Sequence, residues 1–318
     1  MKYSPMLCKL MKRPFDDKGW IFESKIDGVR IIAIKNGSKI KLLTRNNKDK
    51  AKQFPEIMAT IGRLRPQKLV LDGELAAFRK GVSSFQAIQP RIGQTDPVII
   101  AELVKTVPVR YIIFDLLESE NNDLEHSPLL ERKKKLKAIL AAGQIDRQGN
   151  LVYLDYIARD GITFFKKAKQ KKWEGIIGKK KDSFYKEGGR SGDWVKIKTH
   201  NQQEFVIGAY TPGQGKTKDT FGAVLVGYYR NNKLIYAGKV GTGFTDKERV
   251  ELKKEFLKIK TTKVPFSKDP KEASALWLKP QLVGEFAFGE WTKGDILRQP
   301  VYMGLRIDKA PKSVIKEN

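Results

Sequence analysis

Short apolar runs rich in β-branched and aromatic residues recur along the whole chain, and their spacing changes near residues 199–203. Before that point they alternate with helical patterns, for example in 127–143 and 161–172. After it, five short runs follow one another between Gly, Asn and Pro turns, with a single clear helical pattern in 245–259. This change in the spacing of strand and helix patterns is expected to mark the boundary between two structural domains.

The two segments predict different folds. Residues 1–200 are expected to form an α+β domain of antiparallel sheets and helices, in which Asn36-Gly37 marks a hairpin. Pro128 is expected at the first position of a helix. Residues 201–318 are expected to form a small β-barrel of the oligonucleotide-binding (OB-fold) kind, because five strands with one inserted helix suit that fold.

The charge of the chain favours a polyanionic partner. Lys and Arg number 62 against 36 Asp and Glu, which gives a formal net charge of +26. Nucleic acid is the first candidate, since lysines and arginines that neutralise phosphates release counterions. A ribosomal-type protein, or a proteome rich in lysine, would give the same excess.

Other bulk features narrow the class of protein. No apolar run approaches the roughly 20 residues that span a bilayer, and the basic N-terminus lacks the apolar core of a signal peptide. The single cysteine, Cys8, excludes an internal disulfide and a cysteine-rich zinc site. We therefore expect a cytoplasmic, nucleoid-associated protein with no membrane contact. Only two histidines occur, so any covalent chemistry is expected to use lysine.

The stretch "ESKIDGVR" places Lys25, Asp27, Gly28 and Arg30 within what reads as a half-buried strand. A lysine becomes a nucleophile when desolvation or nearby positive charge removes its proton. Asp27 alone would favour the ammonium form, and is better explained as a metal ligand. These residues suit phosphate transfer, although a surface lysine on a strand–turn–strand would show the same letters.

Further stretches follow in a fixed order: "LLTRNN", "VLDGEL", "YIIFDLL", "EGIIGKK", "DWVKIK" and the C-terminal "LRQPVYMGLRIDK". As a set they resemble the nucleotidyltransferase motifs of ATP-dependent DNA ligases, over nearly the whole chain. The resemblance is nearest to small two-domain bacterial ligases and to the ligase module of end-joining enzymes. Ile307 stands where those proteins commonly have an acidic residue.

The resemblance implies a covalent mechanism that begins at Lys25. This lysine would attack the α-phosphorus of ATP, form a lysine–AMP phosphoramidate and release pyrophosphate. Lys196 and Lys198 would neutralise the α-phosphate and help to keep Lys25 uncharged, because like charges lower its pKa. AMP would pass to the 5′-phosphate of a nick in duplex DNA, and the 3′-hydroxyl would then displace it.

The remaining site residues take roles from the same resemblance. Phe114 would stack on adenine, Glu23 would read the adenine edge and Glu74 would bind the ribose hydroxyls. Asp27 and Glu174 would be ligands of Mg²⁺ (or Mn²⁺). Arg30 and Arg45 would bind the ribose or the nick phosphates. The groups that orient pyrophosphate when the barrel closes would be Arg298, Arg306 and Lys309. From the residues alone, Phe114 would be a core aromatic.

Three alternatives stay open. An RNA-capping guanylyltransferase or an RNA ligase would use the same covalent lysine, and a basic nucleic-acid-binding protein without catalysis would explain the charge. The "TRN" stretch and the C-terminal motif favour the DNA ligase. We expect a monomer that acts in DNA repair or recombination, with a possible partner protein for repair or end joining.

Overall fold

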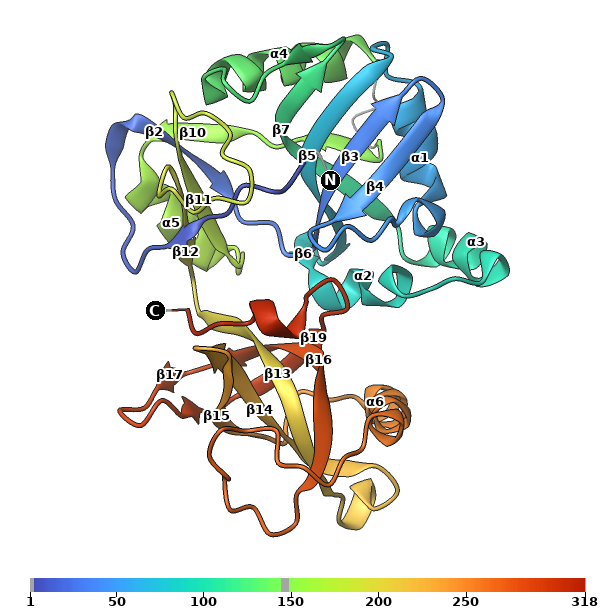
Figure 1. Ribbon diagram of the computed structural model, residues 1–318. Helices are drawn as coiled ribbons and strands as arrows, with labels where there is room; N and C mark the ends of the chain where they lie inside the picture. Colours follow the sequence, from blue (N-terminus) through green and yellow to red (C-terminus); the bar gives the residue numbers. More distant parts are fainter. Residues whose placement is uncertain (1–2, 144–148, 318) are drawn as a thin grey trace. The chain divides into compact units, whose positions relative to one another are not determined.

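The computed structural model describes residues 3–143 and 149–317. It divides into two compact units, Met1–Thr199 and His200–Asn318, each with a core of its own (Figure 1). Among the described residues, no helix is both long enough and apolar enough to cross a membrane.

Unit 1 contains two β-sheets. The first sheet has the strand order β1-β12-β11-β2-β10 and the second has β4-β3-β5-β7-β8. Strands of the first sheet are β1 (Lys9–Leu10), β2 (Asp17–Ser24), β10 (Tyr156–Arg159), β11 (Gly175–Lys180) and β12 (Trp194–Lys198). Strands of the second sheet are β3 (Val29–Asn36), β4 (Lys39–Thr44), β5 (Lys68–Arg79), β7 (Val109–Ser119) and β8 (Asn122–Asp123), with β6 (Val82–Ser84) paired to β5 and β9 (Leu151–Tyr153) paired to β7.

Helices surround the two sheets of unit 1 (Figure 1). They are α1 (Pro55–Gly62), α2 (Phe85–Ile92), α3 (Pro97–Thr106), α4 (Leu129–Ala142) and α5 (Gly161–Gln170), with a short 3₁₀ helix η1 (Ala51–Gln53). The hairpin predicted at Asn36-Gly37 is confirmed, because β3 and β4 pair there and Gly37 has φ +60°. The prediction that Pro128 opens α4 is wrong by one residue: its ψ of 142° is extended, so it caps the helix instead.

The inner faces of the two sheets share one hydrophobic core. Ile21 and Trp194 come from the first sheet, and Ile32 and Phe114 from the second. Alternate residues of the first sheet point the other way: Phe22, Ile176 and Ile197 form a second cluster with Phe164, Phe165 and Ala168 of α5. The alternation therefore separates a face that α5 covers from a face that looks toward the second sheet.

Gly28 lies where the chain leaves the first sheet and enters the second. A Cβ atom at this position would lie 2.2 Å from the carbonyl oxygen of Leu75, a backbone atom that cannot move aside cheaply. We expect Gly28→Ala to lower the free energy of unfolding by about 1–3 kcal/mol, the usual effect of overpacking. Chemical denaturation measures it. Gly62→Ala is the matched control, because the added methyl group would meet only Ile40 at 3.8 Å. The free energy of unfolding of this variant should not fall.

Unit 2 is built on one antiparallel sheet in the order β15-β14-β13-β16-β19. Its elements are β13 (Asn201–Pro212), β14 (Phe221–Arg230), β15 (Lys233–Val240), α6 (Asp246–Lys258), β16 (Leu276–Phe288) and β19 (Val301–Leu305), with a small ribbon of β17 (Glu290–Trp291) and β18 (Leu297–Arg298) and the 3₁₀ helices η2 (Gly215–Thr217) and η3 (Pro311–Ser313). The five predicted strands and the predicted helix are confirmed. Thr245 and Glu248 form a capping box at the start of α6.

Candidate active site

Lys25 lies in the connection between the two sheets of unit 1. β2 ends at Ser24 and β3 begins at Val29, so the single strand expected through "ESKIDGVR" is wrong. The backbone N–H of Lys25 still donates to the carbonyl of Gly175 at 3.0 Å, which holds the residue at the edge of β11. Lys25 therefore lies at the end of the first sheet, where the chain crosses to the second sheet.

Three carboxylates surround the Lys25 ammonium. Its Nζ forms an ion pair with Glu174, whose side chain is 8% exposed, and Glu74 and Asp27 act on it electrostatically. Burial by itself would lower the pKa of Lys25, but the acids outweigh it and raise the pKa above the ordinary lysine value. The carboxylates dominate the surroundings of Lys25 in this structure, so the expectation that Lys196 and Lys198 help to keep Lys25 uncharged stays a prediction.

Glu174→Gln tests directly whether the charge of Glu174 raises the pKa of Lys25. Loss of the Glu174 charge leaves the burial of Lys25 in place, so the pKa of Lys25 should fall by about one to three units. The measurement is an NMR titration of ¹³C-dimethylated lysines, with the exposed Lys18 of β2 as internal reference. An unchanged Lys25 titration in the Gln variant would show that Glu174 does not hold the proton.

Lys196 and Lys198 line the same face of the first sheet as Lys25. β12 pairs with β11 so that Lys196 lies opposite Ile177 and Lys198 opposite Gly175. Gly175 is also the residue that binds the Lys25 backbone. Partner residues in an antiparallel pair point to the same face, so both lysines project from the inner face beside Lys25. Three cations beside three acids suit a phosphate chain that carries a metal ion.

The two predicted metal ligands have different partners. Glu174 is paired with Lys25, whereas Asp27 accepts from the backbone N–H of Phe85 at 2.9 Å, at the start of α2. Within residues 3–143 and 149–317, no group of three or more His, Cys, Asp or Glu side chains is arranged to hold a metal ion. Two carboxylates near a triphosphate nevertheless fit Mg²⁺, which commonly takes one or two carboxylates and completes its shell with water and phosphate oxygens.

Arg30 is committed to a buried acid. Its guanidinium donates to Asp72 through Nε at 2.5 Å and Nη2 at 2.6 Å, and Asp72 also accepts from the hydroxyl of Tyr185 at 2.7 Å. Burial would lower the pKa of Arg30, but Asp72 raises it well above the ordinary value. The expected contact of Arg30 with a phosphate or ribose stays a prediction. Only those N–H groups of the guanidinium that do not face Asp72 are available for it.

Phe114 packs in the core between the sheets. Its ring is 7% exposed, meets Trp194 edge-on at 6.3 Å and has the Arg30 guanidinium 4.6 Å from its centroid. The core alternative that the sequence allowed is thus present in the structure. Stacking of Phe114 on adenine stays a prediction. It requires the base to occupy the space over the ring where the Arg30 guanidinium now lies.

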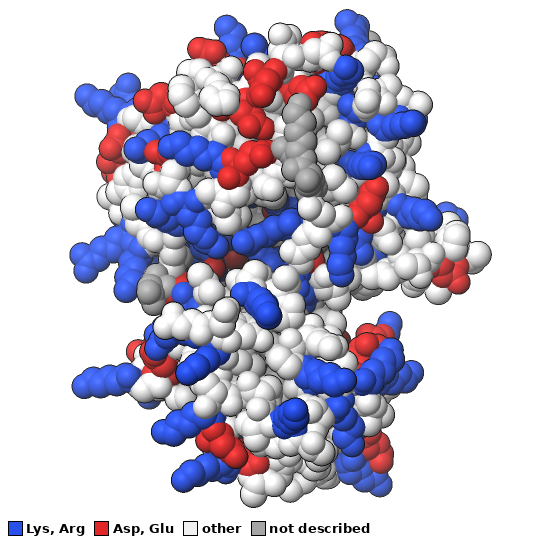
Figure 2. All heavy atoms as spheres, viewed as in Figure 1, with Lys and Arg blue, Asp and Glu red and all other residues white. Residues whose placement is uncertain are grey.

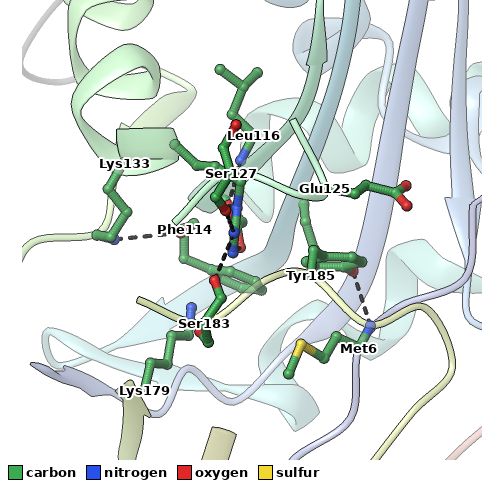
Figure 3. A network of polar contacts seen from close by, with 12 residues as sticks. Met6, Phe114, Leu116, Glu125, Ser127, Lys133, Lys179, Ser183 and Tyr185 are labelled. Atoms are coloured by element: carbon green, nitrogen blue, oxygen red, sulfur yellow. Dashed lines mark hydrogen bonds and ion pairs between the residues drawn. The ribbon is translucent and has the colours of Figure 1, made fainter. Parts of the chain in front are cut away.

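Glu23 has a different environment from the one expected. It lies on β2 opposite Ile177, on the inner face, but its side chain is 1% exposed. One carboxylate oxygen is paired with Lys133 of α4 and the other with Lys179 of β11, the latter at 2.8 Å. Figure 3 shows Lys133 and Lys179 beside Phe114. In this structure Glu23 is a buried counter-ion of two lysines, and its reading of the adenine edge stays a prediction.

The other predicted residues are spread over both units. In unit 1, Glu74 lies on β5 opposite Arg30, close enough to Lys25 to affect its pKa, and Arg45 directly follows β4. Their nucleotide contacts stay predictions. In unit 2, Arg306 is 11% exposed and is bound to Asp308 at 2.8 Å and to Glu285 at 2.9 Å.

Lys309 and Arg298 of unit 2 also have acidic partners. Lys309 pairs with Glu204 at 2.8 Å, and the exposed Arg298 pairs with Glu290 at 2.8 Å. Binding of pyrophosphate by these residues and by Arg306 stays a prediction, and it would require them to exchange these acids for the ligand.

Several buried polar residues near the site escaped the motif analysis. Asp72 and Tyr185 hold Arg30, while Lys133 and Lys179 hold Glu23. The signal for Lys179 was present in "EGIIGKK", since positions 175, 177 and 179 of a strand share one face. Asp72 stands inside "VLDGEL", two residues before Glu74, whereas Lys133 and Tyr185 lie outside the quoted motifs and are brought in by tertiary packing.

A half-buried lysine among carboxylates, beside two further lysines on one strand face, is an arrangement that suits the class of covalent nucleotidyltransferases. Residues 5–198 match the family described as "ATP dependent DNA ligase domain", and residues 217–309 match "ATP dependent DNA ligase C terminal region". The chain belongs to the ATP-dependent DNA ligase family, with an adenylation domain followed by an OB-fold domain.

Relatives of known name agree with this family. The multifunctional non-homologous end joining protein LigD of Mycolicibacterium smegmatis is 34% identical over 99% of this chain, and the match covers 40% of that protein. A DNA ligase of Thermococcus fumicolans is 30% identical over 92% of the chain, covering 52% of that protein. The chain thus spans about two fifths of the length of its LigD relatives.

Solved structures give the same result. The mycobacterial DNA ligase D complexed with ATP and MES has a TM-score of 0.69 and 30% identity, with 99% of this chain and 98% of that one covered. The ligase domain of LigD from M. tuberculosis has a TM-score of 0.53 at 30% identity with the same coverage.

Proposed function

We propose that the chain seals nicks in duplex DNA with ATP, through AMP bound covalently to Lys25. The observation that carries this proposal is the Lys25–Glu174 ion pair at the junction of the two sheets, beside Lys196 and Lys198. This arrangement offers one amine for covalent attack and two further cations for the phosphate that it attacks. Family membership supports ATP as the nucleotide.

Activation of Lys25 requires loss of a proton that the carboxylates now retain. A divalent cation, Mg²⁺ or Mn²⁺, held by Asp27 and Glu174 would neutralise their charge and so remove the main cause of the raised pKa. Lys196 and Lys198 would then act as like charges on the amine and favour its neutral form. The Lys25 ammonium first loses one proton to solvent, and the neutral Nζ then forms a bond to the α-phosphorus as the bond to pyrophosphate breaks. A second proton leaves the nitrogen to give the phosphoramidate.

The later steps use the same site. AMP moves from Lys25 to the 5′-phosphate of the nick, and the 3′-hydroxyl displaces AMP to form the phosphodiester bond. Figure 2 shows Lys and Arg side chains spread over the visible face of each unit, which suits contacts to the DNA backbone rather than to bases. We place the reaction inside the cell, in repair or end joining of DNA, as the name of the LigD relatives suggests.

Incubation with α-labelled ATP and Mg²⁺ tests the proposal. The protein should carry label through denaturing electrophoresis, and a nicked duplex should remove that label and yield sealed product. Absence of label, or transfer of label to RNA ends alone, would contradict a DNA ligase. Replacement of Mg²⁺ by Mn²⁺ or by chelator in the same assay defines the metal requirement.

A further inference from the structure

Helix α2 begins with a hydrogen bond to a distant part of the chain. Ser84 occupies its N-cap position with extended backbone, and serine is among the residues preferred there. Within the described helix, however, the Ser84 side chain makes no capping hydrogen bond. The first N–H of the helix, that of Phe85, donates to Oδ2 of Asp27 at 2.9 Å, across 58 positions of the chain. The connection 25–28, which carries Lys25, is therefore joined to the start of α2.

A second hydrogen bond joins the same two places in the opposite direction. The backbone N–H of Asp27 donates to the hydroxyl oxygen of Ser83 at 3.0 Å. Ser83 lies on β6, which pairs with β5 and leads directly into α2 (Figure 1). Asp27 thus accepts through its side chain and donates through its main chain, which is the reciprocal pattern of a capping box. Two bonds of this kind leave residue 27 little freedom to move.

The helix by itself does not require this arrangement. Ser84 is a residue type that caps the first turn of a helix with its own hydroxyl, and it already stands at the cap position. A cap supplied by Asp27 adds a constraint on the connection 25–28 that a local cap would not add. The main consequence of the two bonds therefore falls on the position of that connection, and less on the stability of α2.

Lys25 lies between two anchored points of the backbone. Its own N–H donates to the carbonyl of Gly175 in β11 at 3.0 Å, and the N–H of Asp27 donates to Ser83. Only Ile26 separates the two anchored residues. The backbone from which the Lys25 side chain projects is therefore held to the first sheet through residue 25 and to the β6–α2 segment through residue 27.

We propose that Ser83 is a positioning residue for the Lys25 nucleophile, acting through the backbone of Asp27. This inference rests on the proposed function. The amine must attack the α-phosphorus in line with the bond to pyrophosphate, and misplacement by about 1 Å can slow such a step by about 100-fold. Without the Ser83 hydroxyl, the Asp27 N–H loses its acceptor and the connection 25–28 gains freedom. The amine then spends less time in the position from which it can attack.

Ser83→Ala tests the assignment on the full chain. The rate of AMP attachment to Lys25 is measured by intact mass in a single turnover, with increasing ATP at constant Mg²⁺. The maximal rate should fall by about 10- to 100-fold, while the ATP concentration that gives half of it should change by less than about twofold. Sealing of a nick that already carries AMP needs no lysine amine, so its rate should stay that of the wild type.

Two matched variants separate positioning from stability. Ser83→Thr keeps the hydroxyl oxygen on a residue that suits a strand, and it should restore most of the attachment rate. Ser84→Ala changes the neighbouring residue, whose side chain makes no capping hydrogen bond to the described helix, and should behave as wild type. Melting curves confirm that each variant is folded.

The results also distinguish this inference from the proposed function. Equal slowing of attachment and of sealing by Ser83→Ala, an unchanged attachment rate, or no recovery in Ser83→Thr would overturn the positioning role while AMP attachment to Lys25 stands. A loss confined to the affinity for ATP would overturn that role as well. Absence of any attachment in the wild type would instead overturn the proposed function itself.

Discussion

Lys25→Ala will abolish the covalent AMP adduct and the sealing of nicks from ATP, a loss on the order of 10³-fold or more. The physical reason is that the reaction needs an amine within reach of the α-phosphorus, and no other residue on that connection carries one. Lys25→Arg should be equally inactive, because a guanidinium does not lose its proton. Gel electrophoresis after α-labelled ATP, with a nicked-duplex assay beside it, measures both losses.

The control for this prediction is a nick that already carries AMP on its 5′-phosphate. Its sealing does not require the lysine amine, so Lys25→Ala should still convert it to product. Lys18→Ala removes an exposed lysine of β2, the strand that precedes Lys25, and should leave every step intact. A labelled Lys25→Ala protein, or one that cannot seal the adenylated nick, would contradict the assignment of Lys25 as nucleophile alone.

Asp115→Ala should lower the free energy of unfolding of unit 1 by about 3–5 kcal/mol. Asp115 of β7 and Arg132 of α4 are both 0% exposed, and the pair is bidentate with two distances of 2.8 Å. Removal of one partner leaves a buried guanidinium without a counter-charge, which is the costly case for a buried pair. Chemical denaturation, followed by tryptophan fluorescence, reports the change.

A double-mutant cycle separates the pair from its surroundings. Asp115→Leu with Arg132→Met removes both charges and should recover much of the loss, since hydrophobic replacement of a buried pair is often nearly neutral. Asp155→Ala breaks an exposed pair with Lys137 at 3.7 Å and should change stability by less than about 1 kcal/mol. Equal losses for Asp115→Ala and Asp155→Ala would refute the argument from burial.

Much of the fold followed from local patterns. The hairpin at Asn36-Gly37, the helix over Leu129–Ala142 and the five strands of unit 2 each have a periodicity and turn residues that nearby sequence supplies. Helices α1, α2 and α3 were not predicted. α2 contains Pro90, a residue that disfavours the interior of a helix, although Phe85, Ile88 and Ile92 share its buried face. α3 buries only Ile100, so its local pattern is weak.

The residues of the candidate site were predictable from the sequence, but the ion-pair partners of their side chains were not. Motif order brought Lys25, Glu174, Lys196 and Lys198 together, and the pairing of β11 with β12 joins them. The state of Lys25 was not predictable, because its pKa depends on how deep the amine lies and on which carboxylates reach it. The partners of Glu23 were not predictable for the same reason, since Lys133 approaches it from a helix that is 110 residues away in the chain.

The sequence by itself determined the candidate nucleophile, the order of the strand motifs and the family, because these depend on residue types at short spacing. Only the tertiary structure decided the charge of Lys25, the confinement of Arg30 by Asp72 and the burial of Glu23 between Lys133 and Lys179. The physical reason is that electrostatic interactions depend on distance and burial in space. Packing of two sheets sets both, and no local pattern records them.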